Sequence, residues 1–297
     1  MDSYKVLPKE VGEEIAKYIE KKSKEENIAK NYINSILRKD VLEILDKYCT
    51  VIYYPIVDKN NGFHLTGIPD KNGKDEHIVF INTHQTMEKQ VFTAAHELGH
   101  VWEIDKYIAD ICGLDLTKDD NSERIINRFA AELLMPTKIF HDKFSELLME
   151  FKNEDDTITI LNLLKLVASL MNFFLVPMKA VFMRLIEIEE LPEEFVASLL
   201  SKKSNSKERD METIVSDSIQ RIIAENGYTE LQKGSGRKGI EGLPELLERA
   251  EETGSVSQNK IDSLRKSFGI KPHGKDQDLE QPVPILKKQG GNKYGDY

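Results

Sequence analysis

The segment that most constrains this chain is His96-Glu97-Leu98-Gly99-His100. In a helix, residues four apart project from one face about one turn apart, so both imidazoles can reach a single metal ion. Glu97 points about 100° away around the helix, where it can act on a water molecule bound to that ion. The motif therefore predicts a helix with a metal site on one side.

The residues around the motif fit such a helix. Apolar residues that recur every three or four positions form a stripe along one side of a helix, and such a stripe is typical of a face that packs on a core. We expect a helix from about Thr86 to beyond Trp102, anchored by this stripe while the histidines line a cleft on the other side. The apolar stripe consists of Met87, Val91, Ala94, Ala95, Leu98 and Val101.

A catalytic zinc site takes three protein ligands and leaves one position open for water. Glu123 is the best candidate for the third ligand, on a helix expected over about 121–134. Asn127 shares a face with Glu123 and can hydrogen-bond a ligand imidazole. Glu132 is the weaker candidate because it lies on the opposite flank of that helix. A carboxylate in a first turn also favours the helix dipole without any metal, so spacing alone leaves the role of Glu123 open.

Other groups give weaker indications. The two cysteines, Cys49 and Cys112, are too few for a disulfide framework or a four-cysteine zinc site. A donor that stabilises an oxyanion is desirable in hydrolysis, but the sequence favours none of the candidates. These candidates are His64, His84, Tyr107 and His141.

Two longer segments carry a family resemblance. Phe92–His100, followed by Asn127–Pro136, resembles the ImmA/IrrE metallopeptidases, and the similarity covers about residues 35–190. The resemblance implies an α+β, minimal zincin-like peptidase domain. In that fold a small twisted sheet packs on the motif helix, and a helix-turn-helix-like segment follows.

The resemblance also implies the roles of the site residues. His96, His100 and Glu123 would bind Zn²⁺, and Glu97 would be the catalytic base. Asn127 would be the hydrogen-bond partner of a ligand histidine. Family members often read E-x-E-A-N where this chain has Glu123-Arg124-Ile125-Ile126-Asn127. The second glutamate of that pattern is Ile125 here, which favours Glu123 as the ligand.

Members of this family cleave helix-turn-helix repressors that silence mobile elements or stress responses, so the resemblance implies a similar protein substrate. The alternative is a non-catalytic regulatory module that acts through protein or DNA contacts, with a structural metal or none. A zinc hydrolase that acts on something other than peptides is a third, weaker hypothesis.

The charge distribution disfavours DNA binding as the primary activity. The net charge is −10, and residues 1–200 contain 24 basic and 35 acidic side chains. A helical pair at 158–188 has the spacing of a helix-turn-helix. Glutamates are concentrated at its end, and their negative charge disfavours contact with DNA. We favour a pair that completes the peptidase core, although this acidic edge could dock a basic DNA-binding protein. As a DNA reader, the second helix would present Met178, Lys179, Phe182 and Arg184.

The pattern along the chain predicts four regions. β-prone runs at 51–57, 63–68 and 77–82 indicate a small antiparallel or mixed sheet. The four regions are N-terminal helices at 1–48, a zincin-like domain at 49–200, a helical extension at 201–270 and a disordered tail at 271–297.

No apolar run approaches the roughly 20 residues of a membrane span, and the N-terminus lacks a secretory signal pattern, so we expect a cytoplasmic protein.

Overall fold

The computed structural model describes residues 6–25, 36–57, 61–69, 75–118, 120–201, 210–240, 243–254 and 256–270, with backbone only at 63–69, 75–76 and 246. The chain forms two compact units, residues 1–241 and 242–297. Residues 210–240 therefore belong to the larger unit and do not form one extension with residues 243–270. The expected tail at 271–297 lies outside the described residues, as does part of the expected N-terminal helices, at 26–35.

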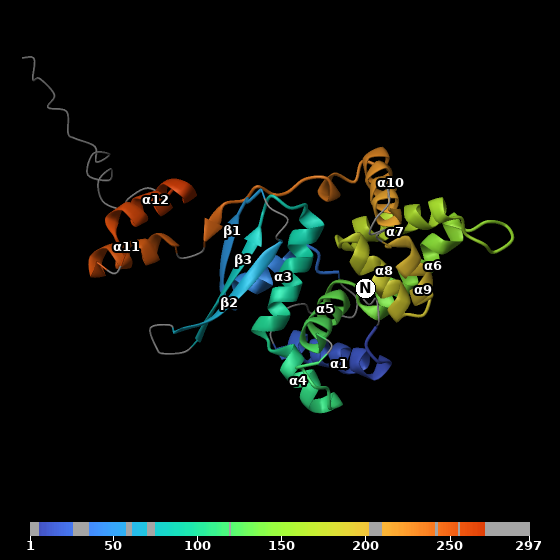
Figure 1. Ribbon diagram of the computed structural model, residues 1–297, viewed down its shortest axis with the longest axis horizontal. Helices are drawn as coiled ribbons and strands as arrows, with labels where there is room; N and C mark the ends of the chain where they lie inside the picture. Colours follow the sequence, from blue (N-terminus) through green and yellow to red (C-terminus); the bar gives the residue numbers. More distant parts are fainter. Residues whose placement is uncertain are drawn as a thin grey trace, which may run out of the picture. The chain divides into compact units, whose positions relative to one another are not determined.

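Helices predominate in the larger unit (Figure 1). They are α1 (Lys9–Glu25), α2 (Asp40–Asp46), α3 (Met87–Val101), α4 (Ile104–Cys112), α5 (Asn121–Leu134), α6 (Thr137–Phe151), α7 (Ile160–Phe174), α8 (Met178–Glu187), α9 (Glu193–Leu199) and α10 (Met211–Glu225), with the 3-10 turn η2 (Thr229–Leu231). The strands are β1 (Thr50–Tyr54), β2 (Gly62–Pro69), β3 (Asp75–Asn82) and β4 (Gly239–Ile240).

The described strands form one mixed sheet in the order β2-β3-β1-β4. β1 is parallel to β3, whereas β2 pairs antiparallel with β3 and β4 pairs antiparallel with β1. The three longer strands coincide with the three predicted β-prone runs. Helix α3 packs against β3 and β2, so the fold is the predicted α+β arrangement of a minimal zincin-like domain.

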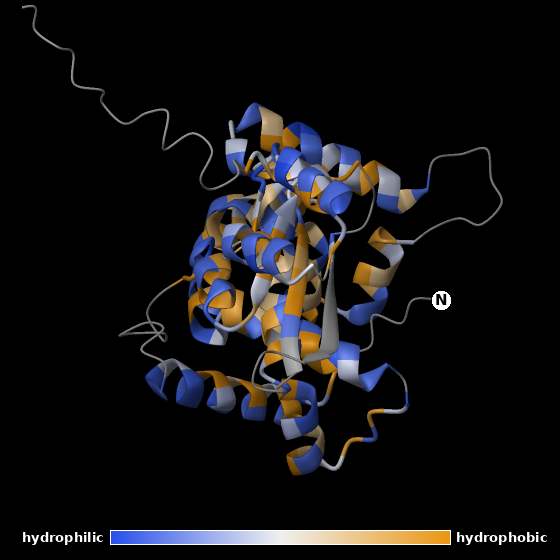
Figure 2. Cartoon of the chain, turned by 90° about the vertical axis from the view of Figure 1, so that its left-hand side faces the viewer, coloured by the Kyte–Doolittle hydropathy of each residue, from blue (hydrophilic) through white to orange (hydrophobic). Residues whose placement is uncertain are grey.

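The face of α3 opposite the histidines is buried as the stripe predicts. Val91, Ala94, Ala95 and Leu98 are all fully buried, and Figure 2 shows hydrophobic residues on the inward faces of the helices and sheet. Gly99 allows α5 to approach closely, because a Cβ atom there would lie 2.9 Å from the Phe129 ring. This close packing of α3 on α5 sets the positions of the candidate ligands.

The segment that follows η2 closes the sheet at the β1 edge. Thr83 Oγ1 donates a hydrogen bond to the Arg237 carbonyl at 2.7 Å, and Ser235 Oγ donates to Gln90 Oε1 at 2.8 Å. A Cβ at Gly234 would lie 2.5–2.7 Å from three backbone carbonyl oxygens, so only glycine fits there without a shift. The segment thus ties β4 and the start of α3 together.

Helices α7 and α8 correspond to the predicted helix-turn-helix-like pair. α7 continues to Phe174, and the break between the two helices comes at Leu175, which adopts a left-handed conformation with φ 59°. Phe182 and Arg184 are fully buried, so α8 cannot present them to DNA and instead packs into the core. Among the described residues no single helix is long and apolar enough to cross a membrane; α7 and α8 together would be, but a bend of 104° separates them.

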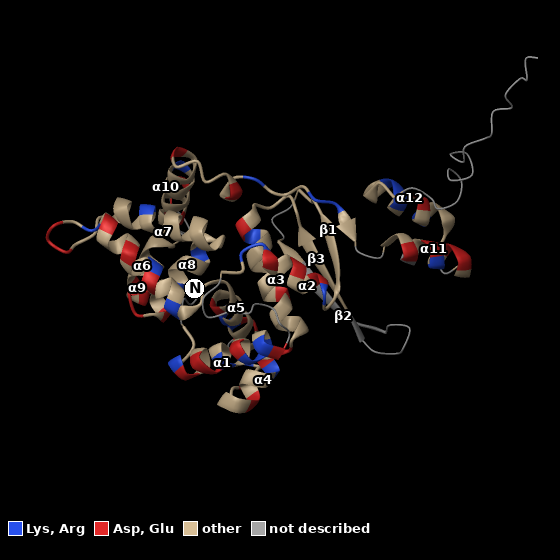
Figure 3. Ribbon diagram, turned by 180° about the vertical axis from the view of Figure 1, so that it is seen from behind, with Lys and Arg blue, Asp and Glu red and all other residues tan. Residues whose placement is uncertain are grey.

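The smaller unit contains a helical hairpin. It consists of α11 (Leu243–Thr253) and α12 (Gln258–Phe268), with charged residues of both signs along both helices (Figure 3). Arg265 Nη2 lies 2.7 Å from Glu251 Oε2 and links the two helices.

Candidate metal centre

Helices α3 and α5 bring the three sequence-predicted ligands together. The Nε2 atoms of His96 and His100 lie 3.2 Å apart. Glu123, in the first turn of α5, places Oε2 3.4 Å from His96 Nε2 and Oε1 3.5 Å from His100 Nε2. Within the described residues, these three side chains are the one group of His, Cys, Asp and Glu whose donor atoms converge as metal ligands would.

The distances within this group fit a tetrahedral ion. Two ligand atoms at about 2.1 Å from one ion, separated by the tetrahedral angle, lie about 3.4 Å from each other. The three observed separations range from 3.2 to 3.5 Å. Two imidazoles and a carboxylate also form a donor set of catalytic zinc sites. The residues therefore fit a metal ion in both chemistry and spacing.

Asn127 lies one turn after Glu123 on α5 and contacts the first ligand. Its Oδ1 lies 3.1 Å from Nδ1 of His96. When the amide oxygen accepts this hydrogen bond, the ring proton stays on Nδ1 and the lone pair of Nε2 points to the group. This is the contact that the shared face of Glu123 and Asn127 predicts.

Burial and mutual contacts shift the pKa values of the three side chains in the group. Burial lowers the pKa of His96, but contacts with Glu123, Glu97 and Asn127 outweigh burial and raise it above its usual value. The pKa of His100 is lowered by burial and by the nearby His96. The hydrogen bond from His96 lowers the pKa of Glu123 despite its partial burial. His96 and Glu123 thus favour each other's charged form, whereas His100 favours the neutral form that can act as a ligand.

Glu97 is buried beside this group, with only 6% of its surface exposed. Burial raises its pKa to about 7, while His96 lowers it and Glu123 raises it further. Its Oε2 atom finds no hydrogen-bond partner among the described residues. A buried carboxylate with an unsatisfied oxygen and a pKa near neutrality is suited to accept and return a proton.

Glu132, the weaker candidate ligand, is not part of the group and lies in a buried ion network. Its carboxylate accepts hydrogen bonds from the Thr137 backbone N–H at 2.9 Å, from Arg184 at 2.5 Å and from Arg128 at 3.2 Å. Glu187 lies 3.0 Å from Arg184 and 2.9 Å from Arg128. The network fastens α5, the ligand-bearing helix, to the start of α6 and to α8.

Sequence reasoning missed this network. It treated Arg184 as a side chain that α8 could present to DNA, whereas Arg184 is fully buried. The signal was present in the sequence, because Arg184 lies on α8 beside Val181 and Leu185, which are also fully buried. A lone arginine within an apolar helix face indicates a buried partner of opposite charge.

The network predicts how stability depends on pH. Burial alone would raise the pKa of Glu132, but Arg184, Arg128 and Thr137 outweigh it and hold the pKa below its usual value. A carboxylate with a lowered pKa in the folded state stabilises the fold above its unfolded pKa, about 4.3. This contribution is lost as the pH falls through the lowered folded value.

We therefore expect the free energy of unfolding, measured with urea between pH 7 and pH 3, to fall on acidification below about pH 4.3. The fall should be smaller in Glu132→Gln, which lacks this titrating group. Equal slopes in the two proteins would contradict this account of Glu132.

Comparison with known proteins agrees with this geometry. Residues 48–185 match the family model described as the IrrE N-terminal-like domain, a peptidase family. No curated protein and no solved structure matches the chain. The matched segment covers just under half of the chain, begins just before β1, ends within α8 and includes His96, Glu97, His100, Glu123 and Asn127. Over residues 48–185 the chain is therefore similar to the IrrE N-terminal-like domain of the ImmA/IrrE metallopeptidases.

Proposed function

We propose that this chain is a zinc-dependent endopeptidase that cuts a specific regulatory protein, and that this substrate is a helix-turn-helix repressor. The convergence of His96, His100 and Glu123 beside the buried Glu97 carries the proposal. A peptidase domain implies a protein substrate, and the repressor follows from the family's known role. We place the activity in the cytoplasm, where DNA-bound regulators are found.

Each residue has a chemical task in this proposal. His96, His100 and Glu123 would hold the zinc ion, and Asn127 would keep the His96 ring in the ligand tautomer. Zinc, when bound, polarises a carbonyl and lowers the pKa of bound water to about 7. Glu97 would take the proton of the attacking water on Oε2, which has no hydrogen-bond partner among the described residues, and would return it to the leaving amine.

The sheet offers a place for an extended substrate. Among the described strands, β2 pairs only with β3 and has a second edge, whereas β4 covers the outer edge of β1. Gly62, the first residue of β2, lies against the Thr93 side chain, one turn before His96. A peptide that adds to β2 by backbone hydrogen bonds would run close to the metal centre.

The alternative function is a binding module without catalysis. The burial of residues on α8 argues against the DNA-binding form of this alternative. The second helix of the helix-turn-helix-like pair buries Phe182 and Arg184 and therefore lacks two of the four side chains that would read DNA. The cleavage experiment below distinguishes hydrolysis from a non-catalytic role through protein contacts.

The test combines the full chain and one equivalent of zinc with helix-turn-helix proteins encoded beside its own gene, and with a proteome-derived peptide mixture. Mass spectrometry of the products should show discrete cuts in one regulator. A chelator should stop the cleavage and added zinc should restore it. Cleavage that persists after metal removal, or no cleavage of any regulator or peptide, would contradict the proposal.

Asn127 provides a test of the ligand geometry. Loss of such a hydrogen-bond partner lowers metal affinity by about 10–100-fold, and we expect Asn127→Ala to lose affinity in this range. Zinc titration against a competing chelator dye measures the change. Asn226→Ala is the matched control, because among the described residues that exposed amide bonds the Ile222 carbonyl of its own helix. Equal affinities of wild type and Asn127→Ala would show that Asn127 does not orient His96.

A further inference from the structure

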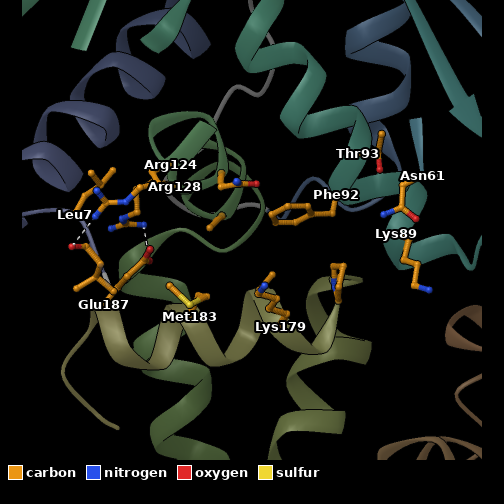
Figure 4. A pocket seen from close by; sticks show the side chains of 15 residues that line it. Leu7, Asn61, Lys89, Phe92, Thr93, Arg124, Arg128, Lys179, Met183 and Glu187 are labelled. Atoms are coloured by element: carbon orange, nitrogen blue, oxygen red, sulfur yellow. Dashed lines mark hydrogen bonds and ion pairs between the residues drawn. The ribbon is translucent and has the colours of Figure 1, made fainter. Parts of the chain in front are cut away.

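A cavity of about 450 Å³ lies beside the metal centre, between α3, α5 and α8 (Figure 4). Asn127 lines it, and the same side chain contacts His96. Phe92 and Thr93 also line it, and they precede His96 on α3 by four and three residues. The cavity therefore continues the metal centre toward the N-terminus of α3.

The walls of this cavity are largely apolar. Phe92 on α3 faces Met183 on α8 across it (Figure 4). Ala131, Pro177 and Ala180 add apolar surface from α5 and from the start of α8. Pockets that bind ligands are mostly lined by such side chains and have volumes of about 300–1,000 Å³. The cavity is therefore suited to an apolar group that would otherwise be exposed to water.

The charged side chains that line the cavity have partners of their own. They are Lys89, Arg124, Arg128, Lys179 and Glu187. Arg128 and Glu187 lie 2.9 Å apart within the buried network. Lys89 donates a hydrogen bond at 3.3 Å to the side chain one turn earlier on the chain, and Arg124 and Lys179 also interact with other groups. Apolar contact, rather than charge, therefore selects what the cavity holds.

The cavity also lies beside the path that we expect for a substrate. Thr93 lines it and contacts Gly62, the first residue of β2, so a peptide that adds to β2 would pass this point. The three residues from Thr93 to His96 span about 4.5 Å along the helix. An extended chain advances about 3.3 Å per residue. The side chain that enters the cavity would therefore belong to a residue one or two positions from the peptide bond at the metal centre.

We propose that this cavity is a specificity pocket for a large apolar side chain, such as leucine, within about two residues of the cleaved bond of the protein substrate. The inference rests on the proposed function and adds the chemistry of the substrate. Phe92, Ala180 and Met183 contact the apolar side chain. A charged or amide side chain would lose its water here without gaining a partner, because the charged groups that line the cavity are already engaged.

Peptide binding to the full-length, zinc-loaded Glu97→Gln protein tests this pocket without cleavage. The probes are fluorescein-labelled octapeptides that alternate serine with leucine, glutamine, glutamate or lysine, so that an extended peptide offers the same side chain in either direction. Fluorescence anisotropy gives their affinities. We expect the leucine peptide to bind about tenfold or more tightly than the glutamine peptide, which corresponds to the burial of one leucine side chain.

Two substitutions assign the preference to the pocket. Ala180→Leu fills part of the cavity and should reduce the leucine-over-glutamine preference by about fivefold or more. Phe92→Ala removes an apolar wall instead of adding volume, and it should reduce the preference by about threefold or more. Ala224→Leu is the matched control, because it adds the same volume at an exposed position of α10 outside the cavity, and it should leave the preference unchanged.

Several results would overturn the pocket assignment. They are equal affinities for the leucine and glutamine peptides, tightest binding of the glutamate or lysine peptide, a preference that neither pocket variant reduces, and no binding of any peptide at millimolar concentration. Because the assay measures binding alone, the pocket can fail while zinc-dependent cleavage by the wild type stands. Leucine-selective binding can likewise persist if the wild type cleaves nothing.

Discussion

Replacement of Glu97 by glutamine is expected to lower the rate of peptide cleavage by about 10²–10⁴-fold, the range that general acid–base groups contribute. Glutamine keeps the size of the side chain but cannot take a proton from water at neutral pH. Because Glu97 is not one of the converging donors, the variant should bind metal as the wild type does. Single-turnover cleavage of the identified substrate, with metal content measured in parallel, tests both statements.

Glu88→Gln is a close control for this substitution. Glu88 lies on the same helix, is 4% exposed, and also has an Oε2 atom without a partner among the described residues. Burial raises its pKa, as it does for Glu97. Since Glu88 is in the first turn of α3, two turns from the ligands, its replacement should leave cleavage intact. A Glu97→Gln variant that cleaves at the wild-type rate would remove Glu97 from the mechanism.

Removal of Arg184 is expected to have the largest effect on stability. Breaking a buried ion pair on one side costs about 3–5 kcal/mol, because the remaining charge stays buried without compensation. Arg184→Met would leave Glu132 and Glu187, whose side chains are 4% and 10% exposed, with Arg128 as the one remaining cation of the network. Urea unfolding of the full chain should show this loss as a lower midpoint.

Lys106→Met provides the comparison for an exposed ion pair. Lys106 and Glu103 are 67% and 59% exposed, and exposed pairs contribute about 0–1 kcal/mol. If Arg184→Met changes the unfolding free energy no more than Lys106→Met does, the network is not what fastens α8 to α5. A double variant, Arg184→Met with Glu132→Gln, should recover part of the loss because one uncompensated charge is gone.

The parts of the site that follow from local geometry could be predicted from the sequence. The common face of His96 and His100, the shared face of Glu123 and Asn127, and the buried stripe of α3 all follow from the helical period. The approach of Glu123 to the histidines depends on how α5 packs on α3, and the two segments are separated by another helix. Gly99 indicates a close neighbour, but its sequence position does not identify α5 as that neighbour.

Features that depend on distant partners could not be predicted. Arg184 is compatible with burial because two carboxylates pair with it, and one of them, Glu132, lies 52 residues earlier in the sequence. The two residues of β4 carry no strand signal of their own, and they become a strand because the preceding segment is tied to Thr83. The predicted strands and the helices of the predicted extension carry local alternation or helical periodicity, and the structure contains them.

We expect His96, His100 and Glu123 to hold one metal ion together. Calorimetric titration of the metal-free full-length chain with zinc tests it most directly, with His96→Ala, His100→Ala and Glu123→Ala beside the exposed-histidine controls His84→Ala and His141→Ala. We expect one ion per wild-type or control chain and a loss of affinity of at least a hundredfold in each ligand variant. Wild-type affinity in the Glu123→Ala variant, or no binding by the wild type, would contradict it.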